Sequence, residues 1–339
     1  MERSAIVHLG WDADWERVFD ESEAVGEPGR IVRVERGECD VETEHGSRRA
    51  QSSSIRSQSE LAPVTGDWVT ILDDGDDDLI ELILPRRSVL SRRDPGERGE
   101  EQPLSANVDL VFLVHGFDRP LRPGKLERFL VLAWNSGAEP IVVLAKSDLA
   151  EPDEIDELTG IVEAVAPGVE VLLTSTENDL GIDRLAELLK PHRSGTLLGE
   201  SGAGKSSLVN ALLGADVQDT NAVRSGDAKG RHTTITRDLR PLPSGGVLID
   251  TPGIRAVGLW DAEDALLAVF DDITTAAVDC RFNDCAHGAE PGCAVVEAVD
   301  EGRIDRRRVD RWRAMADELH ELEARVIERE RSSGRRRRR

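Results

Sequence analysis

Apolar and polar positions follow three different patterns along this chain. From Gly29 to about Leu90 they alternate within short segments, separated by clusters of Gly, Asp and Ser, which is typical of half-buried strands. We expect these closely spaced strands to close into a small barrel, an OB-fold. Before the barrel, Trp11, Trp15 and Phe19 recur every four residues and predict a short amphipathic helix. The expected strands are residues 30–35, 39–43, 67–72 and 79–84.

The second pattern begins after residues 93–103, a stretch rich in Pro, Gly, Arg and Glu that we expect to be a linker. Short continuous apolar runs then alternate with helical periodicity, as in a buried parallel sheet with helices on both faces. This pattern predicts a doubly wound α/β domain. The expected strands are residues 109–114, 140–144, 169–173, 195–198 and 246–249, and the helices lie around 125–136, 153–165, 182–190 and 204–213.

The third pattern, from about residue 260, is mostly helical. One face of its last helix carries Trp312, Met315, Leu319, Leu322 and Val326, and we expect that face to pack inside the protein rather than bind a partner. The fold class is therefore multidomain α/β. The expected domains are residues 1–95, 96–259 and 260–339.

Composition narrows the classes of function. The 339 residues include no apolar run long enough to cross a membrane and no basic-then-apolar leader at the N-terminus, so we expect a cytoplasmic protein without a membrane partner. The net charge of −23 argues against simple whole-surface attraction to nucleic acid, and we expect no DNA partner. Arginines nevertheless cluster locally, and these clusters are either solvated surface or contacts for RNA phosphates: Arg86, Arg87, Arg92, Arg93 and Arg98; Arg303, Arg306, Arg307, Arg308, Arg311 and Arg313; and Arg335 to Arg339.

A complete GxxxxGK[ST] motif, the phosphate loop, lies between a predicted strand and a predicted helix. Its backbone amides are expected to surround the α- and β-phosphates of a nucleotide. Lys205 would reach the β- and γ-phosphates as a catalytic cation, and Ser206 would bind Mg²⁺. The residues expected to bind nucleotide here are Gly199, Glu200, Ser201, Gly202, Ala203, Gly204, Lys205, Ser206 and Ser207.

Two further motifs follow the phosphate loop. Asp250, at the end of an apolar strand, would hold Mg²⁺ through water, and the Gly253 amide would face the γ-phosphate. Between these motifs, a threonine should complete the Mg²⁺ shell and sense the γ-phosphate. Thr234 is the first candidate and Thr233 the second.

A base-reading motif precedes the phosphate loop by more than fifty residues. A carboxylate at Asp148 can accept hydrogen bonds from guanine N1 and N2, which adenine cannot offer. Lys146 would lie along the base plane, with Ser147 between them. The expected pattern is Asn-Lys-x-Asp, but Ala145 occupies the Asn position, so one contact is lost and nucleotide binding should be weaker. Ser175 and Thr176 could supply a backbone amide to guanine O6.

Hydrolysis of GTP to GDP needs a polar group that orients the attacking water. Many small GTPases carry a glutamine directly after Asp-x-x-Gly, whereas this chain has Ile254, so intrinsic turnover should be slow. His232 is our candidate for the missing group, and Arg255 is a weaker candidate for stabilising charge. A protein that binds nucleotide and RNA without hydrolysis and an ATP-dependent enzyme remain alternatives.

Three of the four cysteines cluster with a histidine as Cys280-x4-Cys285-x-His287-x5-Cys293. Three thiolates and one imidazole suit a closed, structural Zn²⁺ site, and three free thiols are the alternative. Cys39 stands apart and is expected to be a small buried hydrophobe.

These motifs, in this order, resemble the circularly permuted, ribosome-small-subunit-dependent GTPases, the RsgA/YjeQ family. The resemblance covers almost the whole chain and includes Val64–Trp68, Arg86 to Pro95, Ala106–Asp109, Gly116–Asp118, Glu200–Ser207, Gly230–Thr234 and the Cys/His cluster. It implies an N-terminal OB-fold that binds RNA, a permuted GTPase domain and a C-terminal zinc domain. It also implies a role in late maturation of the small ribosomal subunit, with the subunit and its rRNA as partners and stimulators of hydrolysis. We expect a monomer.

Overall fold

The computed structural model describes residues 4–35, 37–51, 62–73, 78–93, 101–214, 237–250 and 259–336. The chain divides into two compact units, which we describe separately. Unit 1 comprises Met1–Leu90, Pro103–Leu121 and Ser136–Ala256, and unit 2 comprises Ser91–Gln102, Arg122–Asn135 and Val257–Arg339. None of the described helices is both long and apolar enough to span a membrane.

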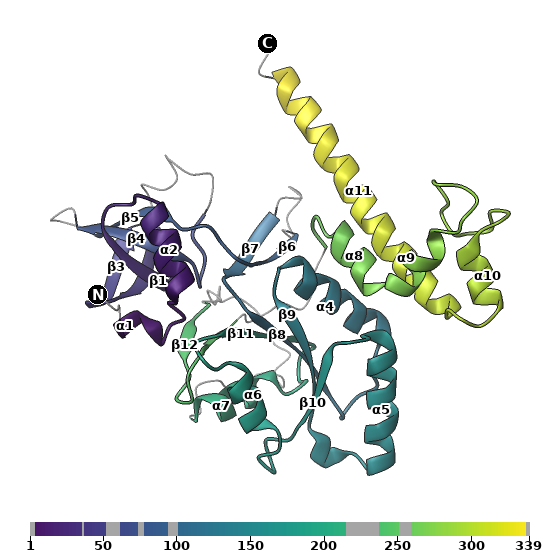
Figure 1. Cartoon of the computed structure of the whole chain (residues 1–339), viewed down its shortest axis with the longest axis horizontal. Coiled ribbons are helices and arrows are strands. Elements are labelled where there is room, and N and C mark those ends of the chain that lie inside the picture. The colour runs from purple at the N-terminus through teal and green to yellow at the C-terminus, as the bar shows by residue number, and fades with distance from the viewer. Residues whose placement is uncertain are drawn as a thin grey trace, which may run out of the picture. The chain divides into compact units, whose positions relative to one another are not determined.

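A closed barrel forms the first part of unit 1, with strands in the order β1-β2-β3-β5-β4 (Figure 1). Its interior is filled by side chains such as Ile31, Val41 and Ile80, which confirms the expected OB-like architecture. Cys39 is buried there as predicted, and burial raises the pKa of its thiol to about 12. The strands are β1 Glu27–Val34, β2 Glu38–Thr43, β3 Gly46–Gln51, β4 Trp68–Asp73 and β5 Asp78–Ile83.

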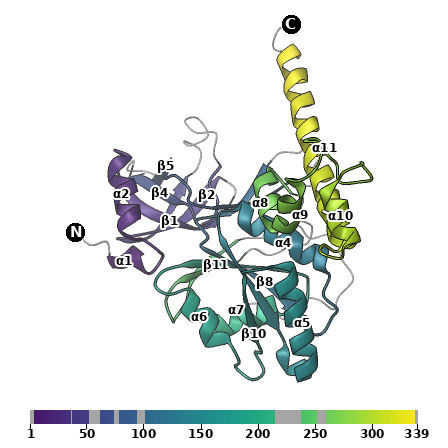
Figure 2. The ribbon, with the colours of Figure 1, turned by 45° about the vertical axis from the view of Figure 1, so that its right-hand side comes forward.

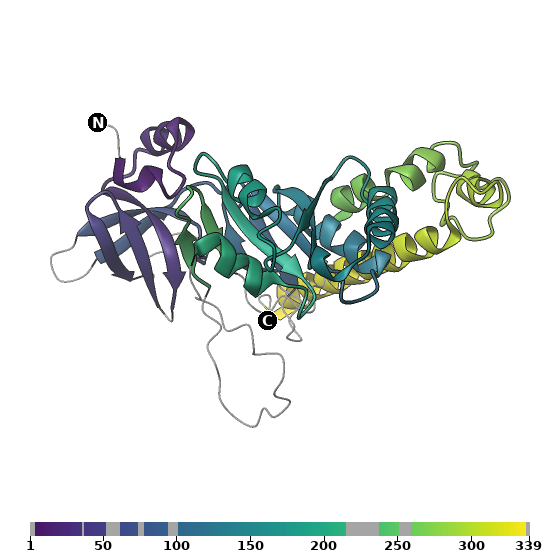
Figure 3. The same ribbon diagram turned by 90° about the horizontal axis from the view of Figure 1, so that it is seen from below.

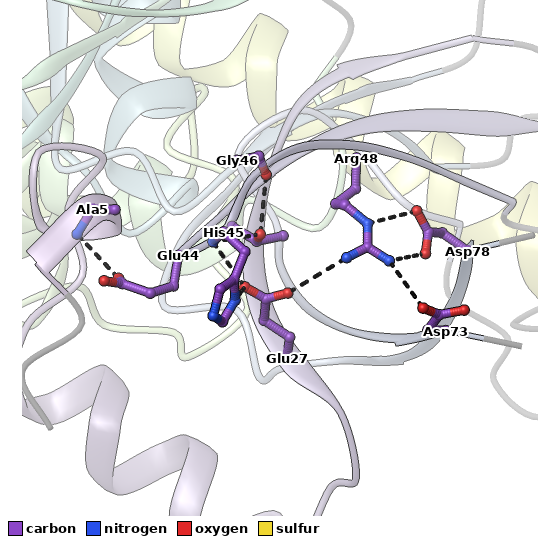
Figure 4. Close-up of polar contacts among 9 residues, drawn as sticks. Ala5, Glu27, Glu44, His45, Gly46, Arg48, Asp73 and Asp78 are labelled. Carbon is purple, nitrogen blue, oxygen red and sulfur yellow. Dashed lines mark hydrogen bonds and ion pairs between the residues drawn. The ribbon is translucent and has the colours of Figure 1, made fainter. Parts of the chain in front are cut away.

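Strand β3 was not predicted, because polar residues dominate its sequence and only Ala50 of its six residues is buried. Ionic contacts hold it instead (Figure 4). Arg48 Nε donates to Asp78 Oδ2 at 2.7 Å, and this hydrogen bond lowers the pKa of Asp78. On the other side of the guanidinium group, Arg48 Nη1 lies 3.9 Å from Glu27 Oε2. Charge pairing here replaces the apolar alternation that normally identifies a strand.

Two short N-terminal helices, α1 (Ser4–Val7) and α2 (Ala13–Glu21), lie beside the barrel (Figure 3). The Asp12 side chain caps α2 by accepting a hydrogen bond from the Trp15 amide. The Trp11 ring centroid lies 4.8 Å from that of Trp68 in β4, and the Trp15 centroid lies 6.0 Å from it. The predicted aromatic spacing therefore anchors the helix to the barrel.

A six-stranded sheet forms the rest of unit 1, in the order β10-β9-β8-β11-β13-β12. The first five strands in this order are parallel, and β12 at the edge is antiparallel to β13. This confirms the predicted doubly wound sheet, although the short edge strand β12 was not predicted. The strands are β8 Leu110–Gly116, β9 Glu139–Ala145, β10 Glu170–Thr174, β11 Ser194–Gly199, β12 Leu239–Pro241 and β13 Val247–Ile249.

Helices cover both faces of this sheet (Figure 2). The helices α6 (Ile182–Leu188) and α7 (Lys205–Leu213) pack on one face, where Leu185 and Leu208 join a core with Phe112 of β8. The helix α5 (Pro152–Val165) lies on the other side. The short 3₁₀ helix η1 (Ser147–Leu149) follows β9.

Unit 2 is mainly helical. Its helices are α4 Pro123–Asn135, α8 Glu263–Val269, α9 Asp271–Ala277, α10 Ala294–Asp300 and α11 Arg306–Arg336. Met315, Leu319 and Leu322 of α11 are buried, which supports the predicted packing face. The side chain of Val326 lies outside the described residues. Strands β6 (Val89–Arg93) and β7 (Glu101–Ala106) pair with each other, so residue 93 and residues 101–103 of the expected linker belong to strands.

A buried ion cluster ties α4 to α11 within unit 2. The Glu127 side chain is fully buried and accepts hydrogen bonds from Arg308 Nη1 at 2.9 Å and Arg311 Nη2 at 2.8 Å. Arg308 Nε also donates to Asp272 at 2.8 Å. Both guanidinium groups are paired with carboxylates, so these arginines stabilise the packing of unit 2.

Candidate functional site

The phosphate loop, residues 199–206, joins β11 to α7, as the motif requires. Its first residue must be glycine, because a Cβ on Gly199 would lie 2.3 Å from the Val114 carbonyl oxygen of the neighbouring strand β8. Lys205 Nζ donates to the carbonyl oxygens of Gly199 at 2.8 Å and Glu200 at 2.7 Å. Its ammonium group is therefore held against the loop. Ser206 and Ser207 lie partly exposed in the first turn of α7.

The base-reading motif lies against this loop. Lys146 Nζ donates to the Gly202 carbonyl oxygen at 2.7 Å and to Asp118 Oδ2 at 2.9 Å. The Lys146 backbone adopts a left-handed conformation with φ of 61°, which ends β9 sharply and begins η1. Because β9, β8 and β11 run parallel, their carboxyl ends meet at one edge of the sheet. Segments far apart in the sequence thus form one site.

Asp148 is exposed in η1, beside Ser147, and Ser175 Oγ donates to its Oδ1 at 2.5 Å. This hydrogen bond orients the carboxylate. The Ser175 amide donates to the Leu180 carbonyl oxygen at 3.0 Å. Of the two residues considered for an amide contact to a base, the half-buried Thr176 is therefore the better placed.

Ala145, which replaces the usual asparagine, is only 2% exposed and belongs to the core between the sheet and α7. A Cβ built on Gly204 would lie 3.5 Å from the Ala145 Cβ. The position therefore faces the phosphate loop directly. A longer polar side chain at this position would contact the phosphate loop, whereas alanine offers the loop no polar atom.

Asp118 and Arg119 also belong to the site, although the sequence motifs gave neither residue a role there. Arg119 Nη1 donates to the Ser201 carbonyl oxygen at 2.6 Å, and its Nη2 donates to Asp118 Oδ2 at 2.9 Å. The Arg119 hydrogen bond, together with Lys146, holds the pKa of Asp118 well below its usual range. Their position in the sequence could have indicated this role, because both residues follow the central strand β8 at the edge of the sheet where the other motifs lie.

Asp250 directly follows β13 and ends the described range 237–250. Its amide donates to the Asp238 carbonyl oxygen at 2.9 Å. Since β13 pairs in parallel with β11, Asp250 lies at the same edge as the phosphate loop. The other residues predicted for this part of the site lie outside the described residues: His232, Thr233, Thr234, Gly253, Ile254 and Arg255.

The cysteine–histidine cluster lies in unit 2 between α9 and α10. The ligand atoms of Cys280, Cys285, His287 and Cys293 all lie within 4.8 Å of one another. Cys280 Sγ is 3.9 Å from Cys293 Sγ and 3.5 Å from His287 Nδ1. A tetrahedral Zn²⁺ would separate two sulfurs by about 3.8 Å and a sulfur from a nitrogen by about 3.5 Å. The four residues therefore fit such an ion.

The electrostatics of the cluster also suit a cation. Burial and the neighbouring thiols raise the pKa of Cys285 to about 11, because nearby negative sulfurs repel one another. Burial lowers the pKa of His287 and favours the neutral imidazole that a metal binds. A bound cation would remove the repulsion between thiolates.

The arginine clusters are only partly on the surface. Arg86 is nearly buried and pairs with Asp67 at 2.7 Å, and Arg308 and Arg311 pair with Glu127 as described above. We had expected these three arginines to be either solvated surface or RNA contacts, but they pair instead with the buried carboxylates of Asp67 and Glu127. Arg303, Arg306 and Arg307 remain exposed. The side chains of Arg93, Arg98 and Arg335 to Arg339 lie outside the described residues.

Comparison with known proteins gives a consistent result. The sequence model of the RsgA GTPase family matches residues 83–260. A protein of Streptomyces avermitilis named "Small ribosomal subunit biogenesis GTPase RsgA" is 48% identical over 335 residues, covering 98% of this chain and 90% of the relative. The crystal structure of YjeQ from Thermotoga maritima aligns with a TM-score of 0.65 and 30% identity, over 86% of this chain and 98% of that one. YloQ, described as a circularly permuted GTPase, shares the fold with a TM-score of 0.61 and 24% identity, over 88% and 95% of the two chains.

Proposed function

Because this chain belongs to the RsgA GTPase family, and is thus a P-loop GTP hydrolase, we propose that it acts in biogenesis of the small ribosomal subunit. In this proposal it binds the subunit through rRNA during late maturation, and the bound subunit stimulates hydrolysis of GTP to GDP. The main observation in support of a nucleotide site is the 2.7 Å hydrogen bond from Lys146 Nζ to the Gly202 carbonyl oxygen. It joins the base-reading motif to the phosphate loop.

Each side of the nucleotide has its own set of residues in this proposal. The phosphate-loop amides and Lys205 bind the phosphates, and the Lys205 charge stabilises the negative charge that develops during transfer. Asp148 accepts hydrogen bonds from guanine N1 and N2, while the Thr176 amide donates to guanine O6. Lys146 lies along the base, held by Asp118.

Magnesium and water complete the proposed reaction. The hydroxyl of Ser206 and the carboxylate of Asp250 are oxygen donors of the kind that Mg²⁺ prefers, with Thr234 as the third donor. A bound Mg²⁺ would neutralise charge on the β- and γ-phosphates. His232 orients the attacking water in place of the glutamine that many small GTPases use, and the Gly253 amide faces the γ-phosphate.

The remaining parts supply the interaction with the ribosome. We assign residues 1–95 to RNA binding, 96–259 to the GTPase domain and 260–339 to a domain that one structural Zn²⁺ holds together. Exposed Arg303, Arg306 and Arg307 are suited to rRNA phosphates. A protein that acts on ribosomal subunits works where these are assembled, so we propose a cytoplasmic location, a monomeric chain and no DNA partner.

Phosphate release measured with and without purified small subunits tests this function. We expect slow intrinsic turnover and stimulation of about a hundredfold or more, since a positioned group completes the site. His232→Ala should lose most of this stimulation while GTP affinity persists. If small subunits at any concentration leave the turnover of the wild-type chain unchanged, the ribosomal role is refuted. Normal stimulated turnover in His232→Ala would remove the histidine from the mechanism and leave the role itself intact.

A further inference from the structure

An ion pair joins the barrel to the edge strand of the sheet within unit 1. Arg33 of β1 and Asp238 form an antiparallel β-bridge just before β12. Arg33 Nε donates to Asp238 Oδ1 at 2.7 Å, and Arg33 Nη2 donates to Oδ2 at 3.1 Å. This two-pronged geometry fixes the carboxylate in plane and position. The Asp238 side chain is 17% exposed and the Arg33 side chain is 40% exposed, so the pair is partly shielded from solvent.

The same aspartate also supports the nucleotide site. Its carbonyl oxygen accepts the amide hydrogen of Asp250 at 2.9 Å, and Asp250 is the proposed magnesium residue. A single residue therefore holds the barrel through its side chain and Asp250 through its backbone. Any shift of Arg33 relative to the sheet would move the atom that fixes the Asp250 backbone.

Two further contacts lie at the same joint. Thr65 Oγ1, in the barrel loop before β4, donates to the Arg237 carbonyl oxygen at 3.0 Å. A Cβ added to Gly66 would lie 2.9 Å from Ile249 Cδ1, so this loop packs against the residue that precedes Asp250. The barrel thus touches both strands of the β12–β13 hairpin at the end nearest the nucleotide site.

We propose that the Arg33–Asp238 ion pair is a positioning contact for GTP hydrolysis, through which the barrel sets the location of Asp250. Occupation of the barrel by rRNA would then alter turnover through this contact. The second statement rests on the proposed ribosomal function, and the first does not. Arg33 acts through Asp238 and has no contact with the nucleotide.

The charges around the pair make it suitable for mutation. Arg240 Nη2 also donates to Asp238 Oδ2 at 3.0 Å, so Asp238 keeps a cationic partner when Arg33 is replaced. We therefore expect Arg33→Ala to fold and to melt close to the wild-type temperature. Arg49 provides a matched control, because it is an ion-paired arginine of the same barrel whose partners are Glu35, Glu38 and Asp40, on the barrel itself.

The experiment compares Arg33→Ala, Asp238→Asn, Arg49→Ala and the exchanged pair Arg33→Asp/Asp238→Arg in the full-length chain. It measures kcat and KM for GTP at saturating small subunits, the kcat without subunits, and subunit affinity. We expect Arg33→Ala and Asp238→Asn each to lower the stimulated kcat about tenfold with little change in KM, because small displacements of a reacting group are costly. The exchanged pair should recover part of that loss, and Arg49→Ala should resemble the wild type.

Two outcomes would overturn the proposal. If Arg33→Ala weakens subunit binding, Asp238→Asn strengthens it and both keep the wild-type kcat, Arg33 is an RNA contact. If both variants melt earlier but keep the wild-type kcat, the pair merely stabilises the fold. Should the wild-type chain show no response to subunits, the ribosomal function fails, and the kcat without subunits still tests the positioning role.

Discussion

The phosphate-loop site and the cysteine–histidine cluster are two ligand sites built in opposite ways. The first combines residues from separate parts of the sequence: Lys146 and Ser175 directly follow β9 and β10, and Lys205 begins α7 after the loop that follows β11. Its cationic side chains donate to backbone carbonyl oxygens of the loop, as Lys146 does to Gly202 and Lys205 does to Gly199 and Glu200. The second takes all four ligand atoms from residues 280–293 and brings them within 4.8 Å of one another.

This difference teaches what each site can do. Lysine and arginine hydrogen-bonded to loop carbonyls can exchange those partners for phosphate oxygens, so the first site suits a ligand that arrives and leaves. Closely spaced thiols that repel one another once ionised need a permanent cation, so the second suits a structural ion. The first site depends on the sheet being folded, whereas we expect folding of the second to depend on the proposed zinc ion.

Cys293→Ser should have the largest effect and would sharpen the comparison. Cys293 begins α10 and its Sγ accepts a hydrogen bond from the Val296 amide, so loss of the thiolate should release zinc and unfold residues 275–300. We expect unit 2 to lose about 3 kcal/mol or more, because the binding energy of a structural metal stabilises the fold. Zinc content per chain and helix content by circular dichroism measure this, and titration with labelled GTP should remain near wild type.

Cys39→Ala is the control for that variant, since Cys39 lies in the barrel core. It should keep one zinc ion per chain. A full complement of zinc in Cys293→Ser would contradict the proposed ligand set, and loss of GTP binding would show that the two sites depend on each other.

Ala145→Asn should have a moderate effect on the first site alone. An amide facing Gly204 would restore a polar contact, and one hydrogen bond of about 1 kcal/mol corresponds to roughly fivefold tighter GTP binding. Competition of labelled GTP by GDP and ATP measures affinity and base preference together. Ala145→Val adds bulk without a polar group and should give no such gain. Equal weakening by both substitutions would mean that the buried position has no room.

Asp118→Asn should have the smallest effect, and its pH dependence is specific. The Arg119 hydrogen bond and Lys146 lower the pKa of Asp118 from its ordinary value of 3.8. A lowered carboxyl pKa stabilises the fold above pH 3.8, and that contribution disappears as pH falls through the folded-state pKa. The variant should lose about 1 kcal/mol or less at pH 7, because these side chains are partly exposed.

Urea unfolding of Asp118→Asn and the wild type between pH 7 and pH 3 checks this prediction. The difference should stay constant down to about pH 4 and then shrink. Glu170→Gln removes an exposed ion pair with Arg184 and serves as the control for loss of one negative charge. A difference that grew on acidification would contradict the assigned direction of the pKa shift.

Most of the sheet and the separate motifs of both candidate sites could be predicted from the sequence, because each motif has a local signal. Strand β9 is a continuous apolar run, and the four cysteine–histidine ligands lie within one short segment. Strand β3 could not be found, because its sequence has no apolar period and the Arg48–Asp78 ion pair joins it to the neighbouring strand β5. Arg86 and Arg308 looked like surface charges because their buried partners, Asp67 and Glu127, are far away in the sequence. Tertiary pairing of that kind has no local signature.

The placement of α4 limits how this protein can be dissected by truncation. The chain leaves unit 1 after Leu121, contributes α4 to unit 2, and returns at Ser136, so unit 2 is not a detachable C-terminal module. Deleting everything beyond residue 257 would strand the carboxylate of Glu127 without either guanidinium group. A truncated chain made to isolate unit 1 would therefore contain an unpaired buried carboxylate. Single substitutions are the safer means of assigning activity to each unit.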